Sequence, residues 1–293
     1  MKVTELAPAK LNLTLEVGEK QADGYHAVQS VMSCAALYDE ITLKSGMGGE
    51  ITMDCDCAQL PCDDTNLCIR AARLFFRKTG AVCDGLHISL VKRIPMQAGL
   101  GGGSADAAAV LRGLRKLYRP EMMIKDLERM AIELGSDVPF CVRGVTTMVR
   151  GRGEQLLKLP KLPLCWFVIC KPDFSLSTAE MYAELDRKQP QCAIDSLGVT
   201  KALEYQDMLE ISQRLGNCFE AVLEADSEIF SIKKKLLAAG ARNACMSGSG
   251  SAVYGLFTEE GAAKAAAETL KKEYPQTCKR SILKPGLPKA FKN

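Results

Sequence analysis

Alternation of apolar and polar residues in the first part of the chain predicts β-strands. The pattern runs through residues 3–18 (VTELAPAKLNLTLEVG) and 28–45 (VQSVMSCAALYDEITLKS), with a turn between them, and returns at 86–95 (LHISLVKRIP). Two shorter strands are predicted at 145–149 and 164–170. The second of these, LCWFVIC, is apolar throughout, which is typical of a strand buried on both faces.

Apolar residues at helical spacing predict helices between these strands. The first covers 65–79, with Asp64 or Thr65 as its cap and Gly80 at its end. The second follows a run of glycines, ends near Tyr118, and carries its arginines and lysines opposite an apolar face. Further helices are predicted at 123–134, with Gly135 as its C-cap, and near 178–187, 200–212, 216–225, 228–239 and 259–272.

Length and composition indicate an ordinary globular protein. The 293 residues are enough for two domains or one large one, and 47% hydrophobic with 25% charged residues is a typical balance. A net charge of +3 does not favour nucleic-acid or membrane-surface binding. The opening residues MKVTELAPAKLNL lack the apolar core of a signal peptide, and no apolar run is long enough to cross a bilayer. We therefore expect a cytoplasmic protein.

The 13 cysteines are expected to act as small apolar residues in a reducing compartment. Four of them, Cys55, Cys57, Cys62 and Cys68, lie close together along the chain. Structural zinc sites usually need paired C-x2-C units or a mixture of cysteine and histidine, and neither is present in this stretch. No metal site is predicted there.

A glycine-rich stretch, PMQAGLGGGSADAAAVL, links the strand at 86–95 to the following helix. Strand, glycine loop and helix N-terminus form a common phosphate-binding arrangement, because the first helical N–H groups have no partner and glycine lets phosphate approach the backbone. Ser104 is placed to cap the helix or to add a hydroxyl contact. The loop is neither a P-loop nor a dinucleotide fingerprint, and a glycine-rich turn needed for tight packing is the alternative.

Three further stretches carry candidate chemistry. Lys10 and Asn12 are two residues apart on a predicted strand and so share a face. Asp137 follows a predicted helix end and precedes Pro139. A second turn of small residues lies at 247–251, for which a purely structural turn is the alternative. An ordinary surface ion pair is the alternative for the lysine and aspartate, but an apolar strand and a helix end are unusual places for solvated charges.

Together these motifs resemble the GHMP small-molecule kinase superfamily. The signature P-x3-G-L-G-[GS]-[GS]-S-[AS] is matched from Pro95 to Ala105. Within the superfamily, the stretches PAKLNLTLEV, KQADGYH, TNL, GLGGGSADAA, LGSDVPF and STAEMY resemble, in order and spacing, the branch whose acceptor is a cytidine diphosphate-linked methylerythritol. The resemblance extends from residue 1 to about 285. It implies a two-domain α+β fold, with an N-terminal half (1–158) akin to the second domain of ribosomal protein S5 and a ferredoxin-like C-terminal half (159–293).

The resemblance also implies an activity. The γ-phosphoryl group of ATP would pass to the 2-hydroxyl of the methylerythritol unit, in the non-mevalonate route to isoprenoid precursors. Asp137 would accept or orient the hydroxyl proton, and Lys10 would hold the aspartate ionised and stabilise charge at the γ-phosphate. Mg²⁺ is implied by ATP as donor, and no protein ligand for it is identified.

Binding roles are implied in the same way. The ATP side comprises Pro95, Met96, Gln97, Ala98, Gly99, Leu100, Gly101, Gly102, Gly103, Ser104 and Ala105, with Asn66 and Lys92 toward the adenosine. The acceptor side comprises Tyr25, His26 and Tyr182 around the cytosine, with Asn12, Ser247 and Gly248 nearby. Core packing is the alternative for the tyrosines, and a chance loop position for the histidine.

Two other functions stay open at this point, namely a mevalonate-, homoserine- or galactose-type acceptor and a catalytically silent nucleotide-binding protein. The expected partner is a small molecule, with no nucleic acid and no membrane, and the expected state is a monomer or weak homodimer.

Overall fold

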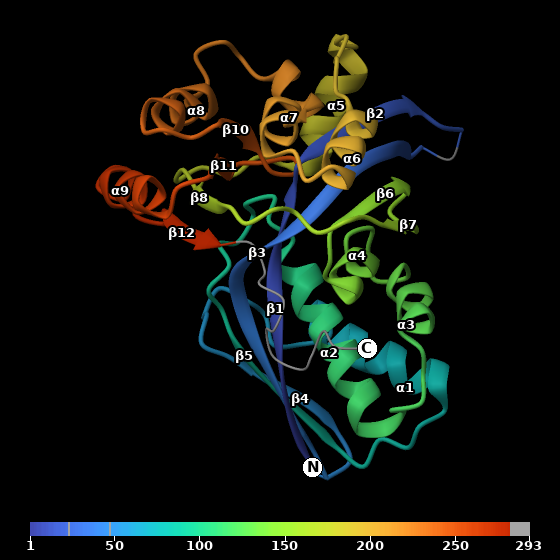
Figure 1. Ribbon diagram of the computed structural model, residues 1–293. Helices are drawn as coiled ribbons and strands as arrows, with labels where there is room; N and C mark the ends of the chain where they lie inside the picture. Colours follow the sequence, from blue (N-terminus) through green and yellow to red (C-terminus); the bar gives the residue numbers. More distant parts are fainter. Residues whose placement is uncertain (23, 47, 282–293) are drawn as a thin grey trace.

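Two β-sheets, one in each half of the chain, organise the molecule (Figure 1). The structure, a computed structural model, describes residues 1–22, 24–46 and 48–281. The N-terminal half contains β1 (Lys2–Asn12), β2 (Thr14–Lys20), β3 (His26–Ser45), β4 (Ile51–Cys55), α1 (Leu67–Thr79), β5 (Leu86–Val91), α2 (Gly102–Tyr118), α3 (Ile124–Ala131), α4 (Val138–Arg143), β6 (Thr147–Gly151) and β7 (Gln155–Lys158). The C-terminal half contains β8 (Trp166–Cys170), α5 (Thr178–Lys188), α6 (Ser196–Glu204), α7 (Met208–Gln213), β9 (Gly216–Asn217), the 3-10 helix η1 (Cys218–Val222), α8 (Glu228–Ala238), β10 (Asn243–Met246), β11 (Val253–Phe257), α9 (Glu260–Leu270) and β12 (Cys278–Ser281).

The long strand β3 is the backbone of the larger sheet. Its first part pairs with β2 and β6, and its last part pairs with β5, while β1 follows it antiparallel from Met32 to Lys44. Through β2 the sheet reaches β9, which belongs to the C-terminal half. The second sheet has the order β10-β11-β8-β12. The proposed division after residue 158 falls in the connection between β7 and β8.

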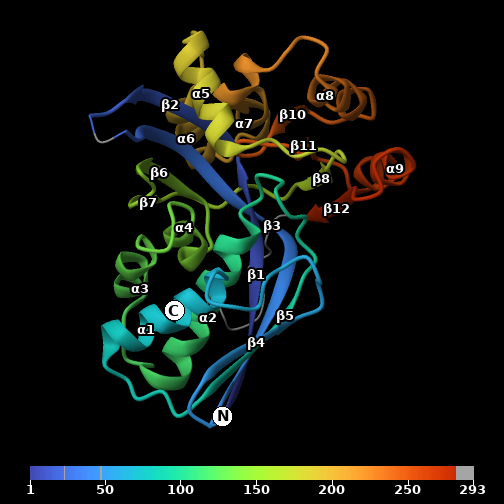
Figure 2. The ribbon, with the colours of Figure 1, turned by 180° about the vertical axis from the view of Figure 1, so that it is seen from behind.

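Three buried apolar clusters hold these layers together. The first lies between the larger sheet and helices α1 to α4, which Figure 2 shows on one side of that sheet. The third joins the smaller sheet to α8 and α9. The second combines Leu11 and Val31 of the N-terminal strands with Phe167, Ile169 and Tyr254 of the C-terminal sheet. Because this shared core crosses the boundary, the two halves pack as one body around their junction.

Most predicted elements are present, and the differences lie at ends and edges. Strand β8 and its complete burial from Phe167 to Cys170 are confirmed. Strands β4, β7 and β12 were not predicted, since each lies at a sheet edge and is only partly buried, so its sequence lacks a clear alternation. The segment predicted as one helix at 200–212 is two, α6 and α7, separated at Gln206 with φ 56°.

Two helix ends and one helix were predicted wrongly. The cap of α1 is Asn66, whose side chain accepts from the Cys68 N–H, and not Asp64 or Thr65. Helix α3 ends at Ala131, so Gly135 does not cap it. The helix expected at 216–225 is strand β9 followed by η1, because the Asn217 amide donates to carbonyls of the turn after β10 and ties this segment there. None of the described helices is long and apolar enough to cross a membrane.

Candidate active site

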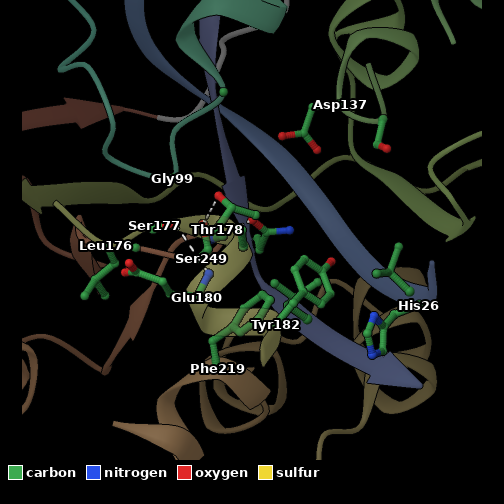
Figure 3. Close-up of a pocket in the computed structure, with 18 of the residues that line it drawn as sticks. His26, Gly99, Asp137, Leu176, Ser177, Thr178, Glu180, Tyr182, Phe219 and Ser249 are labelled. Carbon is green, nitrogen blue, oxygen red and sulfur yellow. Dashed lines mark hydrogen bonds between the residues drawn. The ribbon is translucent and has the colours of Figure 1, made fainter. Parts of the chain in front are cut away.

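A cleft of about 1120 Å³ opens where the two halves meet (Figure 3). Its walls come from β1, the start of β3, the loop before α2, the start of α4, the segment leading into α5, and the turn between β10 and β11. This volume is slightly above the usual range of about 300–1,000 Å³ for small-molecule sites. The predicted site residues that line it are Lys10, Asn12, Tyr25, His26, Gln97, Gly99, Gly101, Ser104, Asp137, Tyr182 and Gly248.

The glycine loop presents an uncapped helix end to this cleft. Helix α2 begins at Gly102, and Gly101, in the left-handed conformation at φ 66°, occupies the N-cap position. No side chain caps this end, so the first N–H groups of α2 remain available to an anion. Ser104 therefore does not cap the helix; it lies inside the first turn and lines the cleft, where the predicted hydroxyl contact remains available.

The glycine loop packs directly on the second turn of small residues, at 247–251. A Cβ on Gly99 would stand only 1.9 Å from the Ser247 carbonyl oxygen, and one on Gly248 would stand 2.9 Å from the Gly99 carbonyl oxygen. The Ser247 hydroxyl donates to the Gly99 carbonyl at 3.0 Å, and the Ala252 N–H donates to the Ala98 carbonyl at 3.1 Å. Tight packing therefore explains why residues 99 and 248 are glycines. The later glycines of the loop, at the start of α2, instead leave backbone N–H groups exposed.

Lys10 lies between these two loops. Its backbone N–H donates to the Leu100 carbonyl at 2.9 Å, which fastens β1 to the glycine loop. The side chain is only 5% exposed, and its ammonium lies 2.5 Å from Asn12 Oδ1 and 3.7 Å from Asp137 Oδ2. A Cβ on Gly101 would stand 2.7 Å from Lys10 Cγ. Because Gly101 has no side chain, the Lys10 side chain can pass beside it to reach the cleft.

Asn12 orients its neighbours. Its Oδ1 accepts from the Lys10 ammonium and from the Gly248 N–H at 2.9 Å, and its Nδ2 donates to Ser30 Oγ at 2.8 Å. The buried Tyr254 hydroxyl, from the other half of the chain, donates to the Asn12 carbonyl at 2.7 Å. Since both lone pairs of Oδ1 are used inside the protein, Asn12 positions Lys10 and the second turn.

Asp137 is free of the structural role that its position offers. It occupies the N-cap position of α4, yet its side chain makes no capping hydrogen bond. The carboxylate is 33% exposed and lines the cleft, with the Lys10 ammonium as its ion-pair partner. A lysine that is 5% exposed does not form an ordinary surface pair, so that alternative fails. One carboxylate and one ammonium therefore face the same space beside the open end of α2.

Aromatic rings form another part of the cleft wall. The His26 and Tyr182 rings stack with centroids 5.0 Å apart at 29°, and Tyr182 meets Phe219 edge-on at 5.0 Å. Figure 3 shows these three side chains in the cleft wall. Burial raises the pKa of Tyr182 to about 12, so its phenol is neutral at physiological pH. Tyr25 is 57% exposed, and the Arg152 guanidinium lies 4.3 Å from its ring centroid. Such a wall suits a flat ring with polar edges.

The segment between β8 and α5 is tied to the second turn. Ser251 Oγ and the buried Lys171 ammonium both donate to the Phe174 carbonyl at 2.6 Å. Thr178 and Ser249 hydroxyls lie 2.7 Å apart, one of the hydrogen bonds drawn in Figure 3. Burial lowers the pKa of Lys171, whose ammonium donates to carbonyl oxygens. This part of the cleft is held by hydrogen bonds from both sides.

Lys92 lies outside the cleft lining, beneath the start of α2. It pairs with Asp39 and, at 2.8 Å, with Asp106, and all three side chains are nearly buried. Burial raises the pKa of Asp106 to about 8; the Lys92 ammonium opposes this shift and the nearby Asp39 carboxylate adds to it. Asp106 Oδ1 is enclosed without a partner among the described residues. Burial alone would lower the pKa of Lys92, but the two carboxylates raise it.

The other predicted residues do not line the cleft. These are Asn66, Lys92, Pro95, Met96, Ala98, Leu100, Gly102, Gly103, Ala105 and Ser247. Sequence reasoning singled out neither Arg152 nor Asp186, which line the cleft. Thr178 and Glu180 also line it, and their only signal was the stretch STAEMY. Within the described ranges, no three or more His, Cys, Asp or Glu residues are grouped as a metal cage.

Comparison with known proteins shows the family of the chain. Residues 66–145 match the family described as GHMP kinases N terminal domain, and residues 199–276 match GHMP kinases C terminal. The chain is 42% identical over 270 residues to the 4-diphosphocytidyl-2-C-methyl-D-erythritol kinase of Macrococcus caseolyticus, covering 92% of this chain and 95% of that protein.

Solved structures extend the comparison. A crystal structure of 4-(cytidine 5'-diphospho)-2C-methyl-D-erythritol kinase has a TM-score of 0.78 and 31% identity, covering 97% of this chain and 100% of that one. The homoserine kinase of Cytophaga hutchinsonii has a TM-score of 0.74 at 21% identity, covering 96% and 94% of the two chains. This last likeness concerns the fold alone.

Proposed function

This chain belongs to the 4-diphosphocytidyl-2-C-methyl-D-erythritol kinase family of the GHMP kinases, and from that premise we propose how its cleft carries out the reaction. The enzyme transfers the γ-phosphoryl group of ATP to the 2-hydroxyl of 4-diphosphocytidyl-2-C-methyl-D-erythritol, with ADP as the second product, in the non-mevalonate route to isoprenoid precursors. The resemblance stated from sequence and the two-domain α+β architecture are confirmed.

Asp137 and Lys10 form the proposed catalytic pair. Phosphoryl transfer needs alignment of the alcohol with the γ-phosphate and positive charge beside the phosphate oxygens. The Asp137 carboxylate accepts a hydrogen bond from the 2-hydroxyl and takes its proton as the new P–O bond forms and the bond to ADP breaks. The buried Lys10 ammonium, 3.7 Å from that carboxylate, stabilises the negative charge of the transferred group.

ATP is proposed to lie with its phosphates at the N-terminus of α2. The uncapped N–H groups there and the hydroxyl of Ser104 support this placement. The adenosine is proposed to lie toward Asn66 and Lys92. Lys92 is nearly buried, and its ammonium would stand 3.2 Å from a Cβ on Gly102, so it lies at the start of α2.

The acceptor is proposed to occupy the opposite end of the cleft. Its cytosine would lie against Tyr25, His26 and Tyr182, because Tyr25 offers an exposed ring and the stacked pair His26–Tyr182 forms part of the cleft wall. The methylerythritol unit would then reach toward Asn12 and the turn that contains Ser247 and Gly248. This order along the cleft brings the 2-hydroxyl to Asp137.

Mg²⁺ is proposed to enter with ATP. Magnesium sites in kinases use few protein ligands and several phosphate oxygens and waters. The residues present fit that pattern, since the Ser104 hydroxyl and the Asp137 carboxylate line one cleft without a group of three acidic residues in the described part of the chain. When bound, Mg²⁺ would neutralise phosphate charge.

We further propose a cytoplasmic monomer or weak homodimer that binds neither nucleic acid nor membranes.

The observation that carries the proposal is the Lys10–Asp137 pair beside the open end of α2. Asp137→Asn is expected to lower kcat by about a hundredfold or more while the ATP dissociation constant stays within a few fold, as measured by ADP release and calorimetry. Asp226→Asn, which changes an exposed aspartate outside the cleft, is the control.

A panel of acceptors tests the remaining alternatives. The cytidine substrate is expected to be turned over, whereas mevalonate, homoserine and galactose are not, because they offer no base to the aromatic wall. Equal turnover of mevalonate would contradict the acceptor assignment. ATP binding without turnover of any acceptor would favour a catalytically silent protein.

A further inference from the structure

Three side chains link the β2–β3 hairpin to helix α5 at the edge of the cleft. The His26 Nε2 atom lies 2.7 Å from Asp186 Oδ1, and the Lys20 ammonium lies 3.1 Å from Asp186 Oδ2. Lys20 ends β2, His26 begins β3, and Asp186 lies in the last turns of α5. The bridge therefore joins the N-terminal half to the C-terminal half beside the stacked ring of Tyr182.

The hydrogen bond to Asp186 determines which nitrogen of His26 carries the proton. An ionised carboxylate only accepts hydrogen bonds, so the imidazole donates from Nε2–H, and in the neutral ring Nδ1 then keeps its lone pair. The pKa of Asp186 is lowered, first by the hydrogen bond from His26 and then by that from Lys20, which keeps the carboxylate ionised. Nδ1 is thus a hydrogen-bond acceptor.

Nδ1 is also the ring nitrogen left for a ligand. It has no hydrogen-bond partner among the described residues, and it is not fully enclosed by the protein. The side chain as a whole is only 7% exposed and lines the cleft. The second oxygen of Asp186 accepts from Lys20, so each carboxylate oxygen has its own partner.

We propose that Asp186 is a positioning residue that makes the base site selective for cytosine over uracil. It holds His26 with Nδ1 as an acceptor, which matches the 4-amino donor of cytosine, whereas uracil has a carbonyl acceptor at that position. The inference rests on the proposed placement of the base beside His26. A buried acceptor facing another acceptor leaves both unsatisfied, and this mismatch is the source of discrimination.

The kinetic test compares the cytidine substrate with its uridine analogue. Asp186→Ala is expected to raise KM for the cytidine substrate about tenfold, to change kcat less than threefold, and to lower the cytidine-to-uridine ratio of kcat/KM at least tenfold. Asp186→Glu, which keeps the carboxylate, is expected to restore part of that ratio. Glu184→Gln is the matched control, because it breaks an ion pair with Arg187 on the same helix outside the cleft.

A spectroscopic measurement tests the tautomer without activity. The chain has only two histidines, His26 and His87, so ¹⁵N imidazole NMR resolves both, and His87→Gln identifies the signals. The wild-type enzyme is expected to show His26 with a protonated Nε2 and an unprotonated Nδ1. Asp186→Ala is expected to shift these signals toward a mixture of tautomers.

Several results would overturn the inference. One is an unchanged cytidine-to-uridine ratio of kcat/KM in Asp186→Ala. Another is an equal loss of kcat/KM with both substrates, accompanied only by a lower melting temperature. The third is a wild-type His26 protonated at Nδ1. They are distinct from failure of the proposed function, in which the wild-type enzyme would not phosphorylate the cytidine substrate although the tautomer is as expected.

Discussion

Replacing Gly101 with alanine tests whether the bare backbone of the glycine loop positions Lys10. Gly101 has φ 66°, where a residue with a Cβ costs about 1–2 kcal/mol. The new Cβ would stand 2.7 Å from Lys10 Cγ, and ordinary contact begins at 3.4 Å, so the lysine stem must move by about 0.7 Å. A misplacement of about 1 Å is worth roughly a hundredfold in rate, so we expect kcat to fall about ten- to a hundredfold.

Gly80 supplies the matched control for this substitution. It has φ 62° at the end of α1, and a Cβ there would have no atom within 4 Å. Gly80→Ala is therefore expected to lose the same 1–2 kcal/mol of unfolding free energy, roughly, with kcat unchanged. The measurements are kcat and KM by coupled ADP release, and unfolding in urea. If both variants lose stability equally and Gly101→Ala retains wild-type kcat, the reasoning that links the glycine to Lys10 is refuted.

Three further predictions concern buried polar groups. The pKa of Asp106 in the folded protein, about 8, lies above its ordinary 3.8, so its contribution to stability is fully present below pH 3.8 and is lost as pH rises through about 8. In urea unfolding from pH 5 to 9, the free energy of unfolding is therefore expected to fall less steeply for Asp106→Asn than for the wild type. An unchanged slope would contradict this. Tyr254→Phe removes the donor to the Asn12 carbonyl and is expected to cost about 1–2 kcal/mol of unfolding free energy, with a several-fold lower kcat; a kcat and unfolding curve like the wild type would show that the bond does not position Asn12. Asn66→Ala is expected to lose about 1 kcal/mol with the α1 cap, whereas Asn66→Asp keeps the cap, so a higher KM for ATP in both variants would separate a contact to adenosine from the capping role.

Local patterns in the sequence were sufficient for the framework of the molecule. Alternation predicted β1 to β3 and β5, and an unbroken apolar run predicted β8, because burial of one face or of both leaves a period along the chain. The glycine run before an apolar helical pattern predicted a helix N-terminus, and the structure begins that helix at Gly102. Motif order then indicated the family.

Contacts between distant segments decided the rest. The sequence could propose Lys10 and Asp137 as partners, but only folding brings β1 and the start of α4 together with the ammonium 3.7 Å from the carboxylate. Asp186 gave no signal, because its helix pattern is the same whether or not a histidine from another half of the chain lies opposite. The segment at 216–225 became a strand and a 3-10 helix for the same reason, since Asn217 bonds to a remote turn.

The difference between what the sequence predicted and what only the tertiary structure decided has one physical cause. Periodicity and turn residues record what each segment does with its own backbone, and these local preferences act over a few residues. Side-chain partners, burial of charge and the shape of the cleft depend on which segments meet across the core, and no local period records that. The sequence alone therefore determined the elements and the chemistry available, and the tertiary structure decided which groups face one another.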